Sequence, residues 1–129
     1  MTNRDICNAA IRLAGETAPA DVPDYLSRAT SLLAAVCSEC ASLDAAYRRA
    51  HDLDDGTWIP CVSVNVDAEF PLCDVFSSPA AYGLAALLTL DENSTLSEAL
   101  YARFASFIGE IRRELPAKPH PVTDVYHLI

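Results

Sequence analysis

The stretch that most constrains the fold is residues 78–90, which read SPAAYGLAALLTL. Ser78 can accept a hydrogen bond from a free amide of a first helical turn, and Pro79 suits the first helical position because its missing N–H needs no partner there. The residues that follow are apolar on nearly every face of a helix, and about 12 residues are too few to span a bilayer. We therefore predict a helix over residues 79–90 that is enclosed by the rest of the chain.

The size and composition of the chain indicate one globular core. The chain has 129 residues, of which 51% are hydrophobic and 21% charged, which is too apolar for intrinsic disorder. Its net charge of −9 argues against sequence-specific DNA binding, which relies on Lys and Arg at the phosphates. We also expect a cytosolic origin and no membrane association, because the sequence has no signal-peptide pattern and no run of about 18 apolar residues.

Apolar residues recur at helical spacing in three further segments. A capping-box spacing near the start predicts a helix over about residues 3–14. The second segment has apolar positions at Leu26, Ala29, Leu33, Val36, Cys40, Leu43 and Tyr47. This period predicts a helix over about residues 23–50. After Ser94, a plausible cap, a wide apolar stripe predicts a last helix that ends near Leu115, before a proline. The chain is therefore predicted to be mainly α, a bundle of about four helices.

Two segments lack the helical period and are predicted to make partner contacts. Residues 58–66 alternate apolar and polar positions, which predicts an extended arm or a small β-hairpin. Residues 116–129 contain prolines that favour an extended C-terminal tail beyond the helical domain of residues 1–115. The predicted contact residues are Val62, Val64 and Val66 in the arm, and Val122, Val125, Tyr126, Leu128 and Ile129 in the tail. The alternative for the tail is that it folds back on its own domain.

No motif in the sequence predicts catalysis. A nucleophile elbow, a phosphate-binding glycine loop and a His-Glu helix motif are all missing from the sequence. Cys37 and Cys40 have the spacing of half a zinc site, but no second pair follows, and both fit a helix as small core residues. The five cysteines, an odd number, fit reduced thiols. We expect no enzyme activity, no cofactor and no catalytic or metal-binding residues.

The order of these elements resembles the head-to-tail connector (adaptor) proteins of tailed bacteriophages. The similarity begins at residues 5–16, DICNAAIRLAGE, which resemble the family's opening helix ending in Leu-x-Gly. It continues through the alanine-rich helix of residues 25–47, an extended segment, and residues 69–74, EFPLCD. Residues 79–86, PAAYGLAA, and the closing helix complete the pattern.

The resemblance implies a structural role in the virion neck, with assembly in the host cytoplasm. It implies a ring, typically of twelve copies, that binds below the portal protein, meets tail or stopper proteins, and lets genomic DNA pass through its lumen without specific binding. The alternative is a small helical regulatory or interaction module, with metal bound through Cys37 and Cys40.

Overall fold

The computed structural model of the protein describes residues 1–15 and 23–115. This part of the chain contains the helices α1 (Asn3–Leu13), α2 (Pro23–Ala50), α3 (Ser77–Thr89) and α4 (Ser94–Glu114), with a short 3-10 turn η2 (Asp74–Phe76) before α3. The predicted mainly α bundle of about four helices is confirmed.

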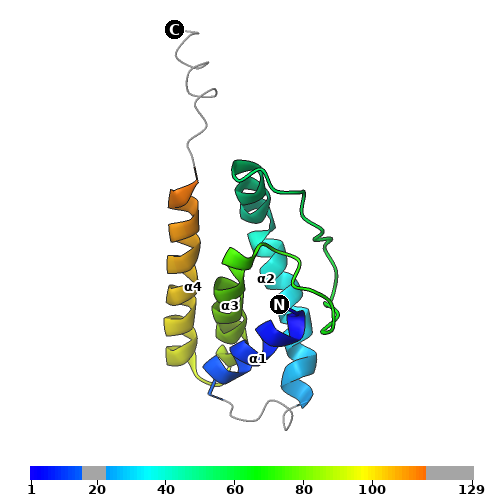
Figure 1. Ribbon diagram of the computed structural model, residues 1–129. Helices are drawn as coiled ribbons and strands as arrows, with labels where there is room; N and C mark the ends of the chain where they lie inside the picture. The colour runs from blue at the N-terminus through cyan, green and yellow to red at the C-terminus, as the bar shows by residue number, and fades with distance from the viewer. Residues whose placement is uncertain (16–22, 116–129) are drawn as a thin grey trace.

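Helix α3 is the central element of the bundle. It packs against α1, α2 and α4, and Figure 1 shows α2 and α4 running parallel to each other on either side of α3, which runs in the opposite direction. Nine of its 13 residues are buried, and Leu84, Ala85 and Leu88 have no exposed surface. The prediction that this apolar helix is enclosed by the rest of the chain is therefore confirmed.

The contact between α3 and α4 is close at Gly83. A Cβ atom at this position would lie 2.9 Å from Cδ1 of Phe104, well inside ordinary carbon contact distance. Two buried hydroxyls support the same region. The Ser97 hydroxyl donates to the Ala86 carbonyl at 2.7 Å, across the two helices, and the Thr89 hydroxyl donates to the Ala85 carbonyl at 2.9 Å.

The start of α1 is joined to the loop that precedes α3. Thr2 forms the predicted capping box with Asp5. The amides of Asn3 and Arg4 donate to the carbonyls of Ala68 and Val66, both at 2.9 Å. Because the first amides of a helix have no partner within it, these bonds fix both the helix start and the loop.

Two predicted caps lie at the wrong residue. Helix α3 begins at Ser77, not after a Ser78 cap, because η2 leads directly into it, and the Ser77 hydroxyl donates to the Asp74 carbonyl at 2.7 Å. Asn93, not Ser94, caps α4, and its side-chain oxygen accepts from the Leu96 amide at 3.1 Å.

Candidate interaction surfaces

The tip of the predicted arm is an exposed apolar surface. The chain between α2 and η2 forms no strand, and the hairpin alternative for residues 58–66 is not what the structure adopts. Val62 is 88% exposed and Ile59 is 75% exposed. Both belong to the segment between α2 and η2, which runs alongside α2 in Figure 1. These two side chains are free to contact a partner, although Ile59 was not among the predicted contact residues.

The other two predicted arm residues lie against their own domain. The Val64 amide donates to the Thr30 carbonyl in α2 at 3.1 Å, and the Val66 carbonyl accepts from the Arg4 amide. Both side chains are half-buried, and Val64 packs on the core. The structure therefore separates the three valines: Val62 is exposed, whereas Val64 and Val66 help to hold the root of the arm.

A partly buried ion pair holds the two ends of this segment to α2. The Asp44 carboxylate accepts from Nε of Arg48 at 2.9 Å and from the Cys73 amide at 2.8 Å. The Arg48 guanidinium also donates to the carbonyls of Asp54, at 3.1 Å, and Pro71, at 3.2 Å. One acidic and one basic side chain thus connect the chain just after α2 with the chain just before η2.

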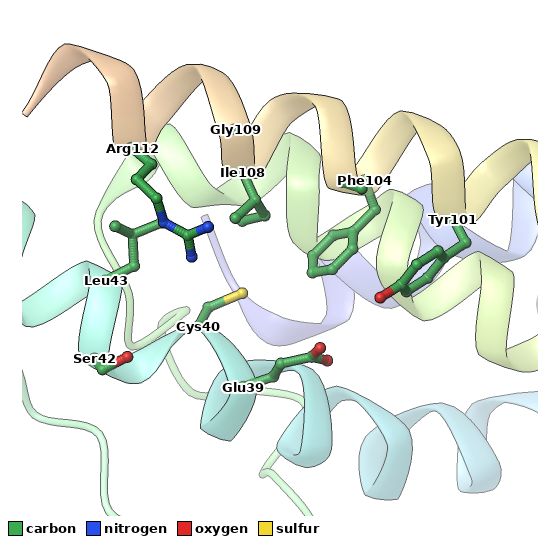
Figure 2. A pocket seen from close by; sticks show the side chains of 10 residues that line it. Glu39, Cys40, Ser42, Leu43, Tyr101, Phe104, Ile108, Gly109 and Arg112 are labelled. Atoms are coloured by element: carbon green, nitrogen blue, oxygen red, sulfur yellow. The ribbon is translucent and has the colours of Figure 1, made fainter.

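A groove between α2 and α4 is the second open surface. Both helices pack on α3, and between them lies a hollow of about 230 Å³. Figure 2 shows Tyr101 and Arg112 projecting from α4 towards α2, with Glu39 projecting from α2 towards α4. Cys40 and Phe104 lie deeper between the helices.

An apolar hollow between α3 and α4 adjoins this groove at Tyr101. Tyr101 also borders a neighbouring hollow of about 370 Å³ whose lining is almost entirely apolar, with Leu87 and Leu90 in its wall. Leu90 is 57% exposed and Tyr101 is 54% exposed. We call the first hollow, between α2 and α4, the α2–α4 groove; the second hollow lies between α3 and α4. The sequence does not predict the α2–α4 groove, because its two walls are helices whose separation is set by a third helix, α3.

The predicted thiol pair is buried in the core. Cys37 has no exposed surface and Cys40 is 3% exposed. Burial raises the pKa of each thiol to about 12, with the neighbouring thiol contributing at Cys37 and Glu39 at Cys40. Metals bind thiolates, so this environment disfavours a metal site at these two residues. Within residues 1–15 and 23–115, no group of three or more His, Cys, Asp or Glu side chains could hold a metal ion.

The predicted tail contacts lie outside the described residues. This applies to all five, Val122, Val125, Tyr126, Leu128 and Ile129. None of the helices in the described chain is long and apolar enough to cross a membrane.

The part of the sequence that spans the arm, α3 and the start of α4 carries acidic but no basic residues. Residues 51–102 carry nine of the 18 Asp and Glu residues and no Lys or Arg. Such a segment repels the phosphates of nucleic acids.

Comparisons with known proteins give no match: no protein-family model, no curated protein and no solved structure is similar to this chain.

Proposed function

We propose that the protein is a structural, non-enzymatic subunit of a phage head-to-tail connector ring, which binds below the portal and continues the DNA channel towards the tail. The observation that carries the proposal is the combination of one closed helical core with two open apolar surfaces, the arm tip at Ile59 and Val62 and the hollow between α3 and α4 beside Leu90 and Tyr101. A ring subunit needs a rigid body and separate surfaces for different neighbours, because head-to-tail contacts use two unlike patches.

The order of the elements and the charge support the same role. The succession of a short capped helix, a long helix, an extended arm and two further helices is the pattern that resembles connector proteins. The acidic stretch of residues 51–102 suits the wall of a channel past which DNA slides without sticking. A charge map of the assembled ring tests this point, since a basic lumen would contradict it.

Mixing the protein with the portal protein encoded in the same genome tests the proposal. We expect stable co-sedimentation, association in a ring, and no bound metal in the purified complex. A genome without a portal gene, or a protein that ignores the portal, would refute the proposed role.

The second candidate is a small helical interaction module. The α2–α4 groove favours it, because a cleft between two helices can receive an amphipathic helix of another protein. Metal binding through Cys37 and Cys40 is the weaker part of this alternative, since both thiols are buried. A metal-bearing monomer that does not respond to the portal would favour it over the connector ring.

A further inference from the structure

We propose that Cys37 in α2 and Cys61 in the arm, residues 58–66, form a reversible disulfide that fastens the arm to α2. The disulfide is independent of the connector ring, because both sulfurs belong to one copy of the chain. Three features of the molecule support it: the register of the arm on α2, the electrostatic influence of one thiol on the other, and the difference in exposure between the two thiols.

The arm runs antiparallel to α2 and in direct backbone contact with it. The chain leaves α2 at Ala50 and returns alongside the helix, as Figure 1 shows. The Val64 amide donates to the Thr30 carbonyl at 3.1 Å, towards the other end of α2. The residues that precede Val64 in the arm therefore lie beside the part of α2 that follows Thr30.

This register places Cys61 beside the face of α2 that carries Cys37. Cys61 precedes Val64 by three residues, which cover at most about 10 Å of extended chain. Cys37 follows Thr30 by seven residues, a rise of about 10.5 Å. Seven residues make nearly two helical turns, so Cys37 lies on the same face of α2 as Thr30, which the arm contacts.

The two thiols also interact electrostatically. Burial raises the pKa of the Cys37 thiol to about 12, and the nearby thiols of Cys40 and Cys61 add to this effect. Burial raises the pKa of Cys7 and Cys40 as well, but Cys61 does not contribute at either of them. Because a Coulomb interaction weakens with distance, this difference selects Cys37 as the buried thiol next to Cys61.

The arm can bring its sulfur to bonding distance. A disulfide needs Cα atoms about 4.4–6.8 Å apart, and strands whose backbones share hydrogen bonds bring paired Cα atoms to about 5.5 Å. The hydrogen bond between Val64 and Thr30 holds the arm to α2 in a comparable way. Val62 and Ser63, between Cys61 and Val64, are exposed and lie at bends of the chain. Cys61 can therefore shift towards α2 without displacing a packed side chain.

The exposure of the two thiols sets the order of the reaction. Cys61 is exposed, so its thiolate attacks one sulfur of a small disulfide such as oxidised glutathione and releases the first glutathione thiolate. Cys37 has no exposed surface and reacts second: its thiolate attacks Sγ of Cys61 and releases the second glutathione thiolate. The two cysteines together lose two electrons and two protons, and oxidised glutathione takes up both to become two molecules of glutathione.

The disulfide acts on the exposed tip of the arm. Ile59 and Val62, the apolar side chains of the tip, lie within two residues of Cys61. A covalent bond to α2 holds both side chains in one position, which reduces the entropy lost when a partner binds them. Reducing compartments keep such a pair as thiols, and oxidising ones close it. The disulfide therefore couples the order of this surface to the redox environment.

Glutathione titration of the folded full-length protein tests the inference. The protein is equilibrated with oxidised and reduced glutathione at a series of ratios, and circular dichroism checks that every sample is folded. We expect the intact mass of the wild type to fall by two hydrogens. A tryptic digest without reductant should then link residues 29–48, which contain Cys37, to residues 50–103, which contain Cys61.

Four variants identify the two sulfurs. Cys61→Ser should form no cross-link, whereas Cys37→Ala should stop at the mixed disulfide, with one glutathione bound to Cys61. The matched controls Cys40→Ala and Cys73→Ala each remove the other cysteine of one tryptic peptide, and both should form the cross-link as the wild type does.

Hydrogen exchange measures whether the cross-link fastens the arm. Exchange in residues 51–66 should slow by at least about tenfold when the wild type is oxidised, because local opening of the arm then has to occur within a closed covalent loop. The same treatment should leave exchange in Cys61→Ser unchanged.

Four outcomes would overturn the inference. The wild type could stop at the mixed disulfide at every glutathione ratio, or it could form only dimers linked through Cys61. The cross-link could be lost in Cys40→Ala or in Cys73→Ala, which would assign it to another pair. Finally, the cross-linked protein could exchange in residues 51–66 as fast as the reduced protein.

Discussion

Replacing Gly83 with alanine tests the packing of α3 against α4. The added Cβ would lie 2.9 Å from Cδ1 and 3.1 Å from Cε1 of Phe104, and the Phe104 side chain is only 5% exposed. Comfortable carbon contacts are about 3.5–4.0 Å, so the ring must move by several tenths of an ångström within a packed core.

The expected change in the free energy of unfolding of Gly83→Ala is the difference between two opposing effects. Alanine is favoured over glycine inside a helix by roughly 0.5–1 kcal/mol, whereas overpacking a core costs roughly 1–3 kcal/mol. We expect Gly83→Ala to lower the free energy of unfolding by about 1 kcal/mol. The matched control is Gly109→Ala in α4, where the nearest atom is the flexible Arg113 guanidinium at 3.5 Å, and where we expect a gain of up to about 1 kcal/mol.

Urea unfolding followed by circular dichroism measures both variants. A second test combines Gly83→Ala with Phe104→Leu, because a smaller side chain relieves the overlap and should reduce the cost of the added methyl group. A Gly83→Ala variant that proves as stable as Gly109→Ala would contradict the close contact between α3 and α4 at this position.

Three further predictions concern the arm and the thiols. Asp44→Asn should lower the free energy of unfolding by roughly 1–3 kcal/mol and speed hydrogen exchange in residues 51–73, because Arg48 loses its charged partner. The control Asp55→Asn, at an exposed position, should change neither quantity. Unaltered exchange in Asp44→Asn would contradict the anchoring role of the ion pair. Burial raises the pKa of the Cys37 thiol from 9.0 to about 12, so the unfolded chain loses this proton first and stability should fall between pH 9 and pH 12. The wild type should therefore lose up to about 1.4 kcal/mol per pH unit more than Cys37→Ala in denaturant titrations over that range, and equal slopes would contradict the burial of this thiol. Cys61 is exposed and should react rapidly with a thiol reagent in the folded protein, whereas the buried Cys7, Cys37 and Cys40 should react only slowly and the half-buried Cys73 at an intermediate rate. Rapid labelling of any of the three buried thiols, located by mass spectrometry, would contradict this burial pattern.

The helices could be predicted from the sequence because their signals are local. The alternating steps of three and four from Ala29 to Leu43 mark the buried side of α2, and these seam residues are indeed buried. The spacing of Thr2 and Asp5 likewise fixes the start of α1. Helix periodicity and capping depend on residues a few positions apart, so one sequence is enough to show them.

The interaction surfaces could be predicted only in part because they depend on contacts distant in sequence. Alternation alone placed Val62, Val64 and Val66 together, but the Thr30 carbonyl and the Arg4 amide bind the last two to the bundle. The role of Asp44 was missed for a similar reason, since its partner amide at Cys73 is 29 residues away. The α2–α4 groove has no local signal, because α3 sets the distance between its walls.

Native mass spectrometry of the full-length protein mixed with its portal tests the connector proposal most directly. The proposal predicts one discrete complex in which a ring of copies, typically twelve, adds to the portal, and in which no metal is bound. A protein that remains monomeric in the presence of the portal would contradict it.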